Sequence, residues 1–228
     1  MKYESISKHN MYIETAEVAG IYPAIQGMRN PMDSWDKSDS SKDKIGLNDL
    51  KLCTSLNIAG PEHRKFKRMI QVWINARMPR YWWSEMDTYH FNTKNSSSTM
   101  HKLLARKTPL TEKDFVVNEE DNDAIRNVIE KLNDIRDQYL NTTDINLKIS
   151  LKRRAKMLLP ESFLQFRTMN TNYEEISNIV HQRHNHQLKE EWVDIFCTWA
   201  TTLPYAKELI FNGLEDVYDV LVPKKLIK

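Results

Sequence analysis

The side chain best suited to chemistry in this sequence is an arginine among the apolar positions of a predicted helix. In NTNYEEISNIVHQRHNHQLKEEW, residues 170–192, one helical face at about 100° per residue holds Asn172, Ile176, Ile179, Val180, Arg183 and Gln187. A half-buried guanidinium needs a carboxylate, phosphate or carbonyl partner, because an unpaired buried charge is strongly destabilising. Arg183 therefore either forms an ion pair with a core carboxylate or contacts a ligand from a rigid helix.

Three histidines in the same stretch raise the possibility of a metal site. His181 and His184 are spaced so that one metal ion could bind both, but His186 points elsewhere on a helix. No H-E-x-x-H pattern occurs. We therefore expect no metal, and histidines that are solvated or lie at an interface.

Two polar segments are candidates for anion binding. The first is a basic run at 152–156, which is either a solvated helix face or a phosphate site, and Lys156 is its member closest to apolar residues. The second is NSSST, residues 95–99, which predicts either a helix cap at Ser98 or Thr99 or an anion-binding turn.

Composition excludes several classes of protein. Only five glycines occur and no glycine-rich phosphate loop is present. A net charge of +2 with only short basic runs argues against nucleic-acid binding. No apolar stretch is long enough for a membrane span or a signal peptide, and the isolated Cys53 and Cys197 are expected to be buried, reduced thiols. We therefore expect a cytoplasmic protein without membrane association.

The elements that must position these residues follow from hydrophobic spacing. We expect a single domain over 1–228 with an exposed loop at 30–47. A strand is predicted over 64–76, and a connector over 105–117. Helices are predicted over 47–56, from Pro79, over 118–140, from Asp144 to Pro160, over 172 to about 200, and over 205–221.

The segment LLPESFLQFRTMNTNYEEISNIVHQRHNHQLKEEW, residues 158–192, resembles the C-terminal half of flavin-dependent thymidylate synthases. The residues that match that register without a gap are Leu159, Pro160, Asn172, Asn178, Arg183 and Glu191. The resemblance implies that Arg183 binds and polarises the pyrimidine ring of dUMP, and that Asn172 and Asn178 lie near the flavin. It also implies that Lys156 replaces an arginine that holds the nucleotide phosphate, which keeps the charge but loses the bidentate fork.

The N-terminal half departs from the family pattern. Pro61-Glu62-His63 resembles a short Glu-His motif that precedes a strand, and Glu85 stands where the family often has glutamine. Counted from Pro79, the window 88–101 aligns with the signature R-H-R-x-x-S-x-N-E-x-S-x-R-Y, and its Asn95 and Ser98 fit. The arginines of that signature are replaced here by Thr88, His90 and Met100. Counting from His63 instead displaces the register by six residues.

By resemblance, the substrate-binding residues are Glu85, Ser96, Ser98, Lys156 and Arg183, and the cofactor-binding residues are His63, His90, Asn95, Asn172 and Asn178. The implied fold is α+β, with helices around a twisted, mainly antiparallel sheet, like that of the thymidylate synthase-complementing proteins. The implied assembly is a homotetramer with active sites between subunits. The implied reaction transfers a one-carbon unit from methylenetetrahydrofolate to dUMP, with FAD as cofactor and NADPH as reductant.

Two hypotheses from other classes stay open. A non-catalytic descendant could bind a nucleotide or a partner protein with the old pocket, and the missing R-H-R arginines favour it. A nucleic-acid-associated protein could use the basic run at 151–156, although the near-neutral net charge counts against it.

Overall fold

A five-stranded sheet forms the centre of the chain. The computed structural model describes residues 5–223, so residues 1–4 and 224–228 of the predicted domain lie outside the described part. The strands are β1 (Ser5–Lys8), β2 (Met11–Ala19), β3 (Gln71–Pro79), β4 (Thr93–Ser96) and β5 (Leu164–Asn172). Their order is β1-β2-β3-β5-β4, and every neighbouring pair is antiparallel. Together with the helices around it, this sheet confirms the predicted α+β class.

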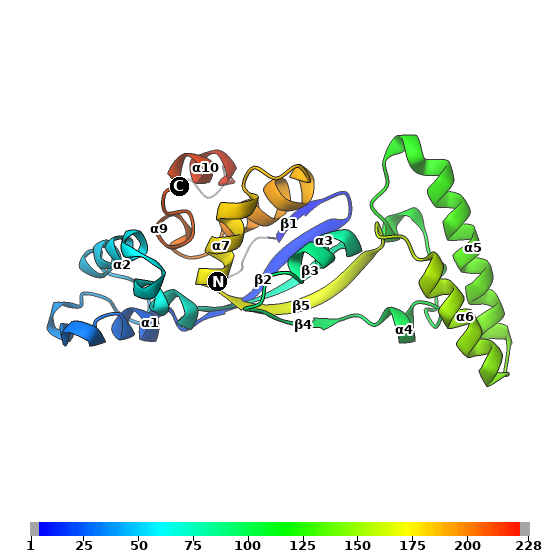
Figure 1. Cartoon of the computed structure of the whole chain (residues 1–228), viewed down its shortest axis with the longest axis horizontal. Coiled ribbons are helices and arrows are strands. Elements are labelled where there is room, and N and C mark those ends of the chain that lie inside the picture. The colour runs from blue at the N-terminus through cyan, green and yellow to red at the C-terminus, as the bar shows by residue number, and fades with distance from the viewer. Residues whose placement is uncertain (1–4, 224–228) are drawn as a thin grey trace.

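Buried and half-buried residues alternate along β3, so one face of this strand is covered by the core. Val72, Ile74, Ala76 and Met78 are fully buried, while the residues between them are half-buried. Period-two alternation of this kind is typical of an antiparallel strand with one face on the core. Helices α7 (Tyr173–Arg183), α9 (Ala206–Leu209) and α10 (Glu215–Leu221) lie on one side of the sheet (Figure 1).

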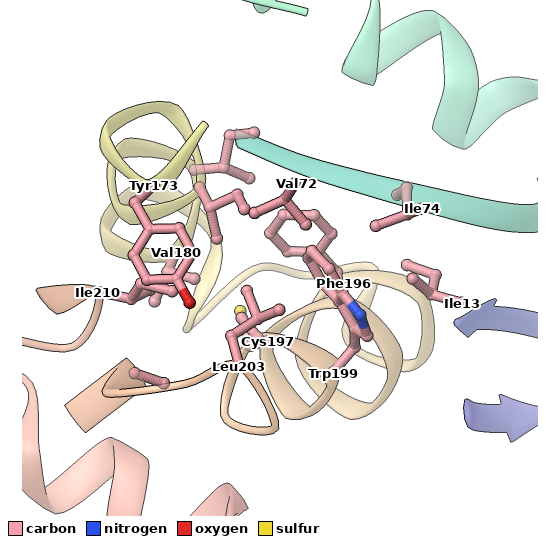
Figure 2. Close-up of a cluster of buried hydrophobic side chains, with 14 of the residues drawn as sticks. Ile13, Val72, Ile74, Tyr173, Val180, Phe196, Cys197, Trp199, Leu203 and Ile210 are labelled. Carbon is pink, nitrogen blue, oxygen red and sulfur yellow. The ribbon is translucent and has the colours of Figure 1, made fainter. Parts of the chain in front are cut away.

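The main core lies between this sheet face and the C-terminal third of the chain. Figure 2 shows Val72 and Ile74 of β3 beside Tyr173 and Val180 of α7 and Trp199 of α8 (Thr198–Ala200). Cys53 of α2 (Leu47–Ala59) and Cys197 are buried free thiols, as expected, and burial raises the pKa of each to about 12. Neither thiol is therefore ionised at neutral pH.

A helical hairpin has a core of its own. Helices α5 (Asn122–Asn141) and α6 (Ile145–Leu158) pack on each other at one end of the molecule (Figure 1). Ile129, Leu132 and Ile135 are buried on one stripe of α5, and Asp144 caps α6 through the backbone N–H groups of residues 146 and 147. Both features confirm the sequence prediction. The predicted connector at 105–117 contains the 3₁₀ turn η5 (Glu112–Asp114), with α4 (Thr99–Lys102) before it and the 3₁₀ turn η6 (Glu119–Asp121) after it.

The segment 30–47 is mostly exposed, but hydrogen bonds to a buried aspartate hold it against the protein. It contains the 3₁₀ turns η1 (Asn30–Met32) and η2 (Trp35–Lys37) and follows helix α1 (Ile21–Gly27). The fully buried Asp49 accepts hydrogen bonds from Arg29 Nε at 2.6 Å, Ser38 Oγ at 2.7 Å and Ser40 Oγ at 2.6 Å. A buried carboxylate requires such partners, so Asp49 holds the segment against α2.

Several predicted elements were wrong in extent. The strand predicted from residue 64 begins at Gln71, because residues 61–69 turn through η3 (Pro61–His63) and η4 (Lys65–Met69), with Phe66 and Lys67 buried together. The predicted final helix is two short helices, α9 and α10, separated at Gly213, whose φ is +81°. β1, β2, β4 and β5 were not predicted.

The long helix predicted over 172–200 was also wrong. It ends at Arg183 and resumes as η7 (Glu190–Cys197), a π-helix. The apolar face changes there because the chain turns between the two segments, and His186 Nδ1 accepts the N–H of Leu188 within the turn. The described part of the chain holds no helix long and apolar enough to cross a membrane.

Candidate functional site

Helix α7 places predicted site residues at both of its ends. It begins at Tyr173 because Asn172 is its N-cap: Asn172 Oδ1 accepts the N–H of Glu175 at 3.0 Å. The acidic first turn agrees with the helix dipole, and Ile176, Ile179 and Val180 bury the helix against the sheet. Asn178 therefore points outward, and Arg183 forms the last residue of the helix.

The first candidate site is a cavity of about 380 Å³ at the start of α7, here called the α7 cavity. Its lining residues are Pro61, Arg64, Arg68, Phe91, Asn172, Glu174, Glu175, Ser177, Asn178 and His181. Asn172 and Asn178, both predicted to lie near a flavin, thus line one cavity. Each uses its side-chain oxygen in the protein, Asn178 by accepting from Gln182 Nε2 at 3.0 Å, so the amide nitrogens are the groups left for a ligand.

The second candidate site lies around the end of the same helix and is called the Arg183 cluster. Arg183 Nη1 donates to Glu85 Oε2 at 2.9 Å, on helix α3 (Arg80–Met86), and Arg183 Nε donates to Tyr89 Oη at 2.8 Å. The guanidinium lies over the ring of Trp192, 4.6 Å from its centroid, and Nη1 is 2.6 Å from His186 Nε2. Trp192 Nε1 also donates to Glu85 Oε2. Nε and Nη1 of the guanidinium and the indole N–H of Trp192 therefore all have partners within the protein.

Glu85 gives Arg183 a carboxylate partner from the protein itself, as the ion-pair interpretation predicted. The ligand contact that the resemblance implies stays a prediction. The arginine is 18% exposed and the glutamate 31%, so the pair lies at the surface of the core rather than within it. Within residues 5–223, the second terminal nitrogen of the guanidinium, Nη2, has no hydrogen-bond partner.

A hydrogen-bonded path connects the two sites. Asn178 accepts from Gln182, Tyr89 Oη donates to Gln182 Oε1 at 3.1 Å, and Arg183 donates to Tyr89. Because Asn178 lines the α7 cavity, a ligand bound there contacts one end of a chain of polar groups that finishes at Glu85. The sequence contained no signal for this path, since its members come from α7 and from the turn after α3.

A third candidate site, the α4 cavity, lies at the junction of the sheet and the hairpin. It is about 270 Å³ in volume, and its lining residues are Arg77, Ser97, Ser98, Thr99, Lys102, Leu103, Arg106, Asp114, Phe163, Leu164, Gln165 and Phe166. Ser98 caps α4 by accepting the N–H of His101. Lys156 reaches this cavity by donating to Thr99 Oγ1 at 2.7 Å, and burial lowers the pKa of its amine.

The other predicted site residues are more scattered. His63 lies exposed in η3, between two residues of the α7 cavity lining, while His90 is exposed one residue before Phe91. Asn95 and Ser96 are exposed on β4, which leads into the α4 cavity. The predicted residues are therefore divided among three places within one chain.

The clustered histidines contact different parts of the protein and not one common point. His181 Nδ1 and Nε2 lie 2.8 Å and 3.0 Å from the carbonyl oxygens of Ser177 and Asn212, whereas His184 contacts carbonyls of its own helix. Among residues 5–223, no group of His, Cys, Asp and Glu side chains is placed to hold a metal ion.

The arrangement of strands and helices is that of the flavin-dependent thymidylate synthases. Thymidylate Synthase X (ThyX) from Helicobacter pylori, solved with FAD and dUMP, superposes with a TM-score of 0.68 at 18% identity, over 91% of this chain and 99% of that chain. A second structure of flavin-dependent thymidylate synthase ThyX from Helicobacter pylori, complexed with FAD and dUMP, gives a TM-score of 0.67 at 16% identity, over 92% and 99% of the two chains. No protein-family model and no curated protein matches the chain.

Proposed function

We propose that this protein is a divergent flavin-dependent thymidylate synthase-like enzyme that binds dUMP and FAD. The observation that carries the proposal is the α7 cavity, where Asn172 and Asn178 meet at the start of a polar path to Arg183. The fold shared with enzymes solved with FAD and dUMP supports it. The amide donors of the cavity fit the acceptor-rich flavin and its phosphates.

In this proposal the chain's own residues bind and orient the nucleotide. Arg183 presents its free Nη2 to a pyrimidine carbonyl, while Glu85, Tyr89 and Trp192 hold the guanidinium in one orientation. The phosphate lies in the α4 cavity with Ser98 and Lys156. His63, His90 and Asn95 are assigned to the flavin, and Ser96 to the substrate, as the resemblance implies. Bound FAD supplies reducing equivalents, renewed by NADPH, while methylenetetrahydrofolate supplies the carbon.

We expect a complete site to form between copies of the chain, as the resemblance implies, because the lining of the α4 cavity shares no residue with the α7 cavity or the Arg183 cluster. Exposed apolar side chains beside the α4 cavity support self-association: Met100 is 48% exposed, Ile149 61% and Met157 76%. Apolar surface of this kind is typical of an interface when it is contiguous. We expect a homotetramer, measured by light scattering, and a charged substitution such as Met157→Lys should reduce its mass.

The decisive experiment measures flavin and product. Purified protein is expected to show a flavin absorption spectrum or to quench FAD fluorescence, and to form dTMP from dUMP with methylenetetrahydrofolate and NADPH. A colourless protein that binds no FAD would contradict the flavin part of the proposal.

A non-catalytic nucleotide-binding descendant is the second candidate. It is favoured by Thr88, His90 and Met100, which replace the signature arginines, and by Glu85, which neutralises Arg183. Thermal stabilisation by dUMP but not by FAD would identify such a binding protein.

A further inference from the structure

The turn between His63 and β3 carries a concentration of positive charge beside the α7 cavity. This basic turn, Arg64–Met69, contains Arg64, Lys65, Lys67 and Arg68. Arg64 and Arg68 line the cavity.

The two cavity arginines have donors to spare. Arg64 Nε is buried without a hydrogen bond and lies 3.9 Å from Glu174 Oε1. Arg68 is exposed, and its side chain forms no ion pair or hydrogen bond within residues 5–223. An arginine whose donors lack protein partners at a cavity wall suits an anionic ligand, because guanidinium groups bind phosphate oxygens in pairs.

The acidic residues of the cavity do not cancel these arginines. Lys67 is only 1% exposed, and its Nζ lies 3.2 Å from Glu174 Oε2, so Lys67 neutralises Glu174 from behind. Glu175 is buried in the first turn of α7. Of the carboxylates that line the cavity, Glu175 is then left to offset the guanidinium groups of Arg64 and Arg68, so the cavity wall keeps a positive excess.

The same cavity is bordered by the segment that lost the signature arginines. Phe91 lines it and directly follows His90, while Thr88 uses its hydroxyl to donate to the Glu85 carbonyl oxygen at 2.7 Å. The side chains at 88 and 90 thus bring no permanent cation to this rim. The basic turn meets the rim from another part of the chain.

We propose that Arg64 and Arg68 bind the diphosphate of the dinucleotide cofactor, and that the basic turn supplies the cations that positions 88 and 90 no longer provide. This inference rests on the proposed function in taking FAD as the cofactor. The two neighbouring phosphate groups of the diphosphate offer oxygens to both guanidiniums, and the amides of Asn172 and Asn178 then face the remainder of the ligand.

Binding titrations with three probes test this assignment. FAD, ADP and riboflavin are titrated against the wild type, Arg68→Gln, Arg64→Gln/Arg68→Gln and the control Lys65→Gln, which removes an exposed charge from the same turn outside the cavity lining. Arg68→Gln should weaken FAD and ADP binding by about tenfold and leave riboflavin unchanged. Lys65→Gln should match the wild type, and thermal melting of every variant checks that it folds.

The outcomes separate this inference from the proposed function. FAD binding that persists within twofold in the double variant would overturn the inference and leave the flavin proposal standing. ADP binding that depends on Arg68, in a protein that takes up no flavin, would overturn the flavin proposal and with it the assignment to FAD, and would leave the two arginines as a diphosphate site for another nucleotide. A wild type that binds neither FAD nor ADP would overturn both.

Discussion

The two ends of helix α7 place arginines in opposite circumstances. At its start, Arg64 and Arg68 border a cavity with few protein partners for their donors. At its end, Arg183 contacts Glu85, Tyr89, His186 and Trp192. The comparison shows that arginines of one chain differ in how many of their donors the protein itself satisfies, so residue type alone does not say how much of a guanidinium is available to a ligand.

The difference also distinguishes two kinds of stability. A satisfied guanidinium contributes to the fold before any ligand binds, whereas an unpaired buried donor costs free energy until a partner arrives. The Arg183 cluster should therefore be rigid in the absence of ligand, and the wall of the α7 cavity should gain stability from an anion. The following variants test this contrast.

The largest effect is expected from Arg183→Ala. It leaves Glu85 without its cation and removes the group packed between Tyr89 and Trp192, so the free energy of unfolding should fall by about 2–3 kcal/mol. Urea denaturation measures this, and dUMP binding should be lost. The exposed pair of Arg126 and Glu112 provides a control, since Arg126→Ala should leave stability nearly unchanged. Equal effects in both variants would contradict the contrast.

The next effect is a dependence of stability on pH at the cavity wall. Burial lowers the pKa of Lys67 from 10.5 to about 8, although Glu174 opposes the shift. Between these values the unfolded chain holds the proton and the folded chain does not, so stability rises with pH by up to about 1.4 kcal/mol per unit. The free energy of unfolding of the wild type minus that of Lys67→Met should therefore rise from pH 8 to 10.5. A constant difference would refute the buried-amine explanation.

A smaller effect separates the two asparagines of the α7 cavity. Asn172→Ala removes the N-cap and should cost about 1 kcal/mol of stability, whereas Asn178→Ala, at an exposed position, should stay within about 0.5 kcal/mol of wild type. Both should weaken FAD binding if both amides contact the flavin. Calorimetry and fluorescence quenching measure the two properties, and an Asn178→Ala variant with unchanged FAD affinity would remove that residue from the site.

The smallest change in stability is expected from Glu85→Gln, which leaves the guanidinium of Arg183 without a neutralising carboxylate, as at the wall of the α7 cavity. The amide still accepts from Arg183 and Trp192 but no longer neutralises the guanidinium, so stability should change by less than about 1 kcal/mol. The affinity for dUMP should rise severalfold, measured by isothermal titration. Lower affinity would mean that Glu85 itself contacts the nucleotide.

Local sequence predicted the helices of the hairpin and the cap at Asp144, and Ser98 is one of the two caps that it offered for α4, because apolar periodicity and capping operate within a few residues. It missed β5, which pairs over its full length with β3, almost a hundred residues earlier. It also missed the basic turn, where Phe66 and Lys67 are buried side by side under contacts from distant elements. Pairing across such separations leaves little trace in local spacing.

The residues of 170–192 alone were enough to place Arg183 on a half-apolar helical face and to require a partner for it, since side-chain direction follows the turn of the helix. Folding selected that partner as Glu85, which is 98 positions away in the chain. Folding also brought Arg64 and Arg68 beside Asn172 and Asn178. A charge's need for a partner is a property of the side chain and its helix, whereas the identity of the partner depends on which distant segments pack together.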